Sequence, residues 1–224
     1  MRAPLLLGAA LSLALASAAG AAELGGVWRA TPGQAALRPV DGGPVPLREE
    51  AKAIYAKRAA ALKAGDRSSD PLSECLPPGV PRLLTHPMPF KIVRGGKVTV
   101  FLFGFNRTNR EIYTSGERFE AIGPAYLGQS FGKWDGEALT VETANFNEVT
   151  WLDDGGLPHS DALRLSERFQ VRGDGLLEDR ILIDDPKTFT RPWTAVLTFR
   201  RLPAQRIAED YCLGRTGVTK PDGN

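Results

Sequence analysis

Histidine, cysteine and long apolar runs are scarce in this sequence, and each scarcity excludes a kind of protein. The 224 residues include two histidines and two cysteines, with no His-x-His, His-Glu-x-x-His or Cys-x-x-Cys spacing. Zinc and copper sites depend on such spacings, so the sequence predicts neither a metal centre nor a cofactor. The formal net charge is only +2 and no basic stripe stands out, which argues against nucleic acid as a partner.

Beyond the first 21 residues, no stretch approaches the roughly 18 consecutive apolar residues that a membrane span needs. Residues 1–21 combine a basic Arg2, an apolar run over 5–16 and small residues ending at Ala21. This arrangement is typical of a secretory signal peptide that is cleaved after Ala21. We therefore expect an exported protein, periplasmic or secreted, with no membrane span.

Residues 22–224 are enough for one domain with a substantial core. The pattern predicts an opening strand over 25–29 and a helix over 47–64, where apolar residues recur at helical spacing between a proline and a glycine. Residues 70–89 carry six prolines. Because proline fixes φ and removes a hydrogen-bond donor, we expect this connector to be extended, with neither a helix nor a central strand.

From residue 90 onward, apolar and polar residues alternate with period two. Gly95-Gly96, Asp135-Gly136 and Gly173-Asp174-Gly175 separate alternating segments, and such turns indicate β-hairpins. Consecutive hairpins over 90–202 make an antiparallel meander whose edges need closure. The predicted fold is therefore mainly β, a meander closed into a barrel, with one N-terminal helix. The expected strands cover 90–94, 97–104, 109–114, 127–134, 138–143, 163–171, 176–184 and 193–202.

The two cysteines are Cys75 and Cys212. In an exported chain such a pair predicts a disulfide, here one that ties the tail to the segment after the helix. A catalytic thiol is the alternative interpretation.

Three charged residues are predicted to point into the barrel with the apolar side chains. Glu167 alternates with Leu165 and Phe169, and Arg110 and Asp179 fall on the inward faces of two other strands. A charge on an apolar face must be paired, hydrogen-bonded or shifted in pKa. Two interpretations stay open: a structural ion pair between Arg110 and one carboxylate, or a polar patch inside a ligand cavity.

Residues 145–163 form a long stretch without helical or strand periodicity, and such loops are often functional. Near its end, His159 is followed by Ser160 and Asp161. A histidine with a nearby carboxylate is a common arrangement for general acid or base catalysis, and a purely structural histidine is the alternative. Ser160 is the immediate neighbour of the histidine and therefore a poor nucleophile candidate. The Gly-x-Ser-x-Gly match at residues 128–132 lies within the strand expected over 127–134 and not at a strand-to-helix turn, so the sequence argues against a serine hydrolase. Residues 153–156 are interpreted as a turn rather than a calcium loop.

Six longer motifs together resemble a large group of poorly characterised secreted bacterial proteins. The resemblance implies a lipocalin-like barrel and, more weakly, a link to periplasmic lyases of lignin-derived aromatic dimers. The motifs are LPPGVPR (76–82), REIY (110–113), FN-x-x-TWLD (146–153), PHSDAL (158–163), ERF (167–169) and IDDPKTFTRPW (183–193). The site residues that the resemblance implies are Arg110, Tyr113, His159, Asp161 and Glu167.

These features predict an exported, single-domain barrel that binds a small apolar or aromatic molecule and performs cofactor-independent acid/base chemistry of lyase or isomerase type. In that hypothesis His159, supported by Asp161, exchanges the proton beside an inward pair of Glu167 and Arg110. The alternatives are a non-catalytic small-molecule carrier and an envelope interaction protein. The sequence determines neither the ligand nor the oligomeric state.

Overall fold

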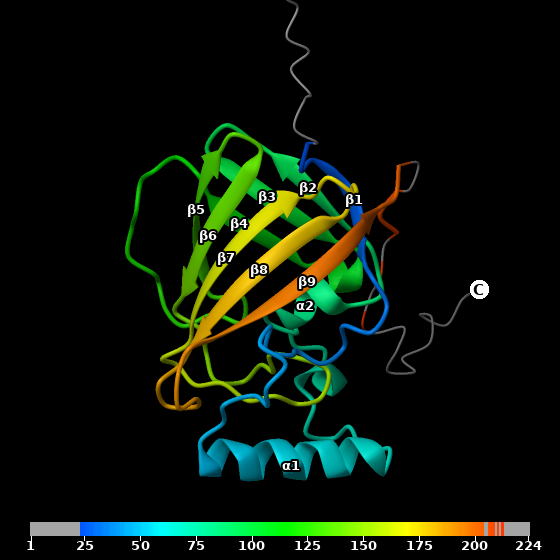
Figure 1. Cartoon of the computed structure of the whole chain (residues 1–224), viewed down its shortest axis with the longest axis vertical. Coiled ribbons are helices and arrows are strands. Elements are labelled where there is room, and N and C mark those ends of the chain that lie inside the picture. The colour runs from blue at the N-terminus through cyan, green and yellow to red at the C-terminus, as the bar shows by residue number, and fades with distance from the viewer. Residues whose placement is uncertain (1–22, 204–205, 209, 211, 213–224) are drawn as a thin grey trace, which may run out of the picture.

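The structure is a computed structural model that describes residues 23–203, 206–208, 210 and 212; the signal peptide predicted for 1–21 lies outside them. Nine strands follow one another around a closed barrel, and the last pairs with the first (Figure 1). The predicted fold class, a mainly β, lipocalin-like barrel with one N-terminal helix, is confirmed. The strands are β1 (Gly26–Ala30), β2 (Phe90–Arg94), β3 (Val98–Phe103), β4 (Asn109–Tyr113), β5 (Gln129–Asp135), β6 (Ala138–Ala144), β7 (Arg164–Val171), β8 (Leu177–Asp184) and β9 (Trp193–Arg201).

Aromatic side chains that alternate toward the inside of the barrel form much of its core. The ring of Phe90 lies edge-on to that of Phe199, with centroids 5.2 Å apart, and Phe101 meets Phe169 edge-on at 5.1 Å. All four side chains are buried. Burial of each phenylalanine contributes about 1.5–3 kcal/mol to the free energy of unfolding. The apolar residues that produce the period-two pattern therefore also stabilise the barrel.

One pair of neighbouring strands departs from the expected antiparallel meander. Strands β4 and β5 are parallel and are joined only at Ile112–Ser130 and Tyr113–Phe131, whereas the other eight neighbouring pairs are antiparallel. Parallel strands require a crossover connection. Residues 114–128 supply it and project from the side of the barrel (Figure 1). We call these residues the crossover segment.

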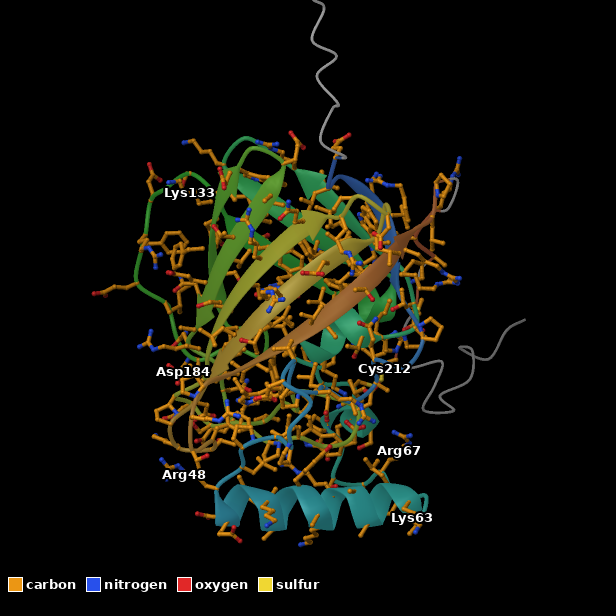
Figure 2. The ribbon with its side chains drawn as sticks, in the orientation of Figure 1. Arg48, Lys63, Arg67, Lys133, Asp184 and Cys212 are labelled. Atoms are coloured by element: carbon orange, nitrogen blue, oxygen red, sulfur yellow. A yellow bond between two sulfur atoms is a disulfide. The ribbon has the colours of Figure 1, made fainter. Side chains whose placement is uncertain are left out.

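Helix α1 (Glu49–Lys63) agrees with the helix predicted over 47–64 and lies beneath the barrel (Figure 1). Figure 2 shows Arg48 and Lys63 at its two ends, on the outside of the molecule. Arg58 links the helix to the loops above it, since its Nη1 donates to the carbonyl of Gly156 at 3.1 Å. No helix within the described ranges is long and apolar enough to cross a membrane.

The prediction that the proline-rich connector contains no helix is wrong. It holds a short 3-10 helix, η1 (Pro71–Glu74), and one turn of α-helix, α2 (Arg82–Thr85). Asp70 caps η1, because its carboxylate accepts a hydrogen bond from the backbone N–H of Leu72 at 3.1 Å. Pro71 occupies the first helical position, where its missing N–H costs nothing.

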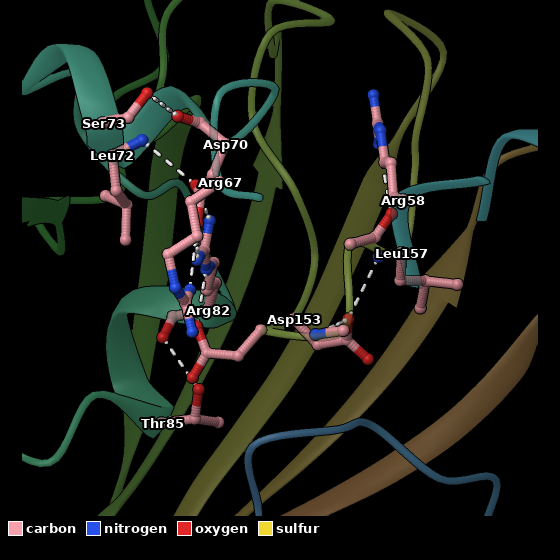
Figure 3. A network of polar contacts seen from close by, with 12 residues as sticks. Arg58, Arg67, Asp70, Leu72, Ser73, Arg82, Thr85, Asp153 and Leu157 are labelled. Atoms are coloured by element: carbon pink, nitrogen blue, oxygen red, sulfur yellow. Dashed lines mark hydrogen bonds and ion pairs between the residues drawn. The ribbon is translucent and has the colours of Figure 1, made fainter. Parts of the chain in front are cut away.

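A buried polar network holds this connector against the base of the barrel (Figure 3). Arg82 donates two hydrogen bonds of 2.8 Å to the carboxylate of Asp70 and one of 2.7 Å from Nε to Asp154. The guanidinium of Arg82 also lies 5.0 Å from the ring centre of Trp151, and Arg58 lies 5.1 Å from the same ring. The network joins the connector, α1 and the 145–163 loop to one another.

The predicted disulfide is confirmed: Cys75 and Cys212 are bonded, with a sequence separation of 137. The bond ties the tail of the chain to the proline-rich connector, at the residue that directly follows η1. Asn106 reinforces the junction, because its amide donates to the carbonyl of Cys75 and accepts from the backbone N–H of Cys212. Neither cysteine is free.

Candidate functional site

Arg110, Glu167 and Asp179 come from three strands and meet inside the barrel, as the alternation predicted. Arg110 Nη1 donates to Glu167 Oε1 at 2.9 Å, and Nη2 donates to Oε2 in a second, very short bond. Arg110 Nη2 also donates to Thr143 Oγ1 at 2.8 Å, and Nε donates to Ser130 Oγ at 3.3 Å. All five residues are buried, with Arg110 only 1% exposed. The predicted ion pair is therefore formed, between Arg110 and Glu167. We call these five residues the interior cluster.

The electrostatics of the interior cluster depend on burial and on the ion pair. Burial alone would lower the pKa of Arg110, but the charge and hydrogen bonds of Glu167 raise it above its ordinary value. Burial raises the pKa of Asp179 well above its usual range; the charge of Glu167 adds to the rise, while that of Arg110 opposes it. Burial and the charge of Glu167 therefore both favour the protonated, neutral form of Asp179 beside the charged pair.

Asp179 is also unusual in its hydrogen bonding. Both of its carboxyl oxygens are buried and have no hydrogen-bond partner in the described part of the chain. Buried polar side chains in folded proteins nearly always have a partner, which is protein or water or a ligand. The interior cluster therefore contains one group with unused capacity to donate and to accept.

The substitution Asp179→Asn is expected to stabilise the protein increasingly as pH rises above about 4. The unfolded carboxyl titrates near 3.9. Because the folded pKa is raised, the folded state binds more protons, and stability is lost as pH rises from about 4 toward the folded pKa. The free energy of unfolding falls with a limiting slope of about 1.4 kcal/mol per pH unit. Asparagine does not titrate, so the variant does not show this loss.

Urea unfolding of both proteins between pH 4 and 8 measures this difference. Asp135→Asn serves as the control, since its side chain is 77% exposed, and its difference from the wild type is expected to stay small throughout. A constant difference between Asp179→Asn and the wild type over that range would contradict a neutral Asp179.

His159 is buried, and both of its ring nitrogens are occupied. Nε2 lies 2.7 Å from Thr150 Oγ1, and Nδ1 lies 3.0 Å from the carbonyl oxygen of Ser160. A carbonyl only accepts, so Nδ1 carries the proton and Nε2 accepts from the threonine hydroxyl. Burial lowers the pKa of His159, although the hydrogen bond to Ser160 and the charge of Asp185 oppose this effect. The imidazole is neutral and its ring is held in place.

Asp161, expected to support His159, contacts a different residue. Its carboxylate accepts a 2.6 Å hydrogen bond from Lys187 Nζ, and both side chains are more than half exposed. Within the described residues, no hydrogen bond or ion pair joins His159 to Asp161, Glu167 or Arg110. His159 and Asp161 thus lie in the 145–163 loop, whereas Arg110 and Glu167 belong to the interior cluster.

Two aspartates organise the 145–163 loop, and the sequence interpretation missed one of them. Asp153 accepts from three backbone N–H groups, including that of Leu157 at 3.1 Å, which confirms a turn at 153–156. The missed residue is Asp185, whose carboxylate accepts from the N–H and the hydroxyl of Ser160 at 2.6 and 2.7 Å. Burial opposes ionisation of Asp185, but these hydrogen bonds hold its pKa below its ordinary value.

Tyr113 lies at the end of β4, at the edge of a hollow of about 440 Å³ between β4 and the crossover segment. We call it the seam hollow. Its phenol donates to Glu111 at 3.1 Å, which raises the pKa of Tyr113. Phe119 and Leu127 supply apolar wall, and Arg110 and Ser130 of the interior cluster also line it.

The fold and this site define a closed β-barrel with a buried polar cluster beside a surface hollow. No protein-family model matches the chain, and no curated protein is detectably similar to it. No group of three or more histidine, cysteine or acidic side chains arranged to hold a metal ion occurs among the described residues.

Proposed function

We propose that this protein binds a small, largely apolar or aromatic molecule in the seam hollow. The observation that supports this proposal is the short pairing of β4 with β5. Only two residue pairs join these strands, and Arg110 and Ser130 of the interior cluster line the hollow beside them. Its volume of about 440 Å³ lies within the range of roughly 300–1,000 Å³ for small-molecule sites. An apolar wall with a few convergent polar groups is the usual composition of such sites.

The interior cluster supports a ligand with one polar end. Arg110 is held rigidly by Glu167, Thr143 and Ser130, so it offers a fixed orientation at little further entropic cost. Asp179 lies on the strand next to Glu167 and is fully buried. Its carboxyl has no partner among the described residues, and it can donate to or accept from a ligand hydroxyl or carbonyl when the β4–β5 junction opens.

We place a binding role ahead of lyase or isomerase chemistry. A general base must reach the proton that it removes, and both nitrogens of His159 are engaged by Thr150 and Ser160. The charges of Arg110 and Glu167 neutralise each other. The motifs at 76–82 and 183–193 further support membership of the secreted bacterial group and, with residues 1–21, export to the periplasm or beyond.

Titration of the purified protein with small aromatic molecules, including lignin-derived aromatic dimers, tests the proposal by calorimetry. The double variant Phe119→Ala/Ile122→Ala removes apolar wall from the hollow. Because both side chains are at least half exposed, the fold is expected to persist. We expect the Kd to rise at least about tenfold, since the lost apolar contacts are worth about 1.5 kcal/mol or more.

The matched control is Val40→Ala/Ile54→Ala, which removes two exposed apolar side chains outside the hollow. It is expected to bind like the wild type. Equal binding by all three proteins would place the ligand elsewhere, and no binding to the wild type would exclude this ligand class. Turnover by the wild type that His159→Ala abolishes would favour the lyase or isomerase hypothesis over the carrier.

A further inference from the structure

A second recess lies on the outer face of the barrel, where β5 to β9 meet the residues that follow β4. Its volume is about 790 Å³, larger than that of the seam hollow. We call it the outer groove. Its floor consists of outward-facing side chains of the sheet, and the beginning of the crossover segment forms one wall. The two recesses share Tyr113 and otherwise contact different stretches of this segment, residues 114–118 for the outer groove and residues from 119 to 128 for the seam hollow.

The strand register places three cations in one line along the floor of the groove. Lys133 on β5 pairs with Thr140 on β6, Thr140 pairs with Arg168 on β7, and Arg168 pairs with Arg180 on β8. Neighbouring strands lie about 4.8 Å apart, so the line from Lys133 to Arg180 is about 14 Å long. Figure 2 shows Lys133 at one side of the barrel, at the β5 end of this line.

The positive charge of this line is largely uncompensated. Like charges directly opposite each other on paired strands are destabilising, and Arg168 and Arg180 are such a pair. The carboxylate of Asp135 lies 3.8 Å from Arg168, in an exposed and therefore weak ion pair. For Lys133 and Arg180, no carboxylate in the described parts of the chain lies within ion-pairing distance.

The remaining lining adds hydroxyl groups, an aromatic end and the acidic residues Glu117 and Glu142, of which Glu142 pairs with Arg118 at the wall of the groove. Thr140, Ser166 and Thr194 line the groove with hydroxyl side chains. At the β5 end, the ring of Phe131 lies 6.0 Å from that of Tyr113, centre to centre. The elongated recess therefore combines a line of cations with hydroxyl groups, aromatic rings and acidic residues.

We propose that the outer groove binds an elongated molecule that carries several carboxylates, the chemistry of an acidic oligosaccharide. Arginine and lysine bind carboxylates through charge-assisted hydrogen bonds, and a line of cations about 14 Å long matches a chain with repeated charges better than a compact anion. The hydroxyl side chains on the floor match sugar hydroxyls.

Calorimetric titration of the full chain with trigalacturonate at low salt tests this inference, with the neutral methyl ester of the trimer and the monomer galacturonate as comparison ligands. We expect the trimer to bind more tightly than the monomer and the ester not to bind. In Arg168→Gln/Arg180→Gln, the Kd for the trimer should rise about 10- to 100-fold, because two charge-assisted contacts are lost.

The matched control, Arg164→Gln/Arg200→Gln, removes two exposed arginines of β7 and β9 that do not line the groove. It should bind the trimer like the wild type; an equal loss in the control would mean general charge attraction and would overturn the proposal. So would no trimer binding, equal binding of the ester, or equal affinity for monomer and trimer. Leu182→Glu, which places a negative charge in the groove, should weaken binding comparably and gives an independent test if the arginine variant does not fold.

Discussion

Replacing Glu167 with glutamine is expected to lower the free energy of unfolding by about 3–5 kcal/mol. The guanidinium of Arg110 is buried, and Glu167 is the partner that accepts two of its hydrogen bonds. Glutamine keeps the shape but removes the negative charge that Arg110 contacts directly, so the guanidinium loses its ion pair in a low-dielectric interior. Equilibrium unfolding in urea at neutral pH measures the loss.

Two further variants separate this cause from ordinary side-chain effects. Arg110→Met/Glu167→Leu removes both charges and should recover most of the lost stability, because apolar pairs of similar volume often replace buried ion pairs without cost. Glu142→Gln breaks the ion pair with Arg118 on the surface, where both side chains are about two-thirds exposed. It should change stability by no more than about 1 kcal/mol. Comparable losses for Glu142→Gln and Glu167→Gln would contradict the argument.

Removing the disulfide with Cys75→Ala/Cys212→Ala is expected to lower the free energy of unfolding by up to roughly 5 kcal/mol. In the chain-entropy description, the bond restricts the unfolded chain more as the closed loop lengthens, and here the two cysteines are 137 positions apart. The folded barrel should persist under native conditions, because both cysteines lie outside its strands.

Chemical denaturation with and without a reducing agent supplies the comparison. Reduction should shift the wild type to the stability of the double variant and should leave the double variant unchanged. A wild type that loses less than about 1 kcal/mol when fully reduced would show that the bond does not restrict the unfolded chain as described.

The sequence predicted the barrel because hydrophobic alternation and hairpin turns both depend on local chemistry. Strand β2 has the same bounds in prediction and structure, 90–94, and the other strands differ by one or two residues at their ends. The same alternation placed Arg110, Glu167 and Asp179 inside. A period of two fixes which face a side chain occupies once the segment is a strand.

Strand direction and long-range side-chain partners were not predictable in the same way. Alternation looks the same in parallel and antiparallel strands. The available signal was the length of the connection, since the expected strands 109–114 and 127–134 are separated by residues 115–126, enough for a crossover. The side-chain partner of Ser160 is Asp185, 25 residues away, and that of Asp161 is Lys187. Adjacent positions such as His159 and Asp161 suggested a contact that the loop geometry does not make.

The connector at 70–89 shows a different limit. Its prolines correctly excluded a long helix, but a single turn needs few internal hydrogen bonds and tolerates proline at its start. The carboxylate of Asp70 decides the outcome. It caps η1 by accepting from the backbone N–H of Leu72, and it holds α2 beside η1 by accepting two hydrogen bonds from Arg82.

The two-residue junction between β4 and β5 also sets where the barrel wall separates most easily. Strands β7 and β8 are joined at eight residue pairs, against two at this junction. Local opening requires breaking the hydrogen bonds and contacts of the region that moves, so its free energy is lowest where these are fewest. We therefore expect openings that admit a ligand or water to Arg110 and Asp179 to begin along this line, ahead of the three-pair junctions of β1 with β2 and β9.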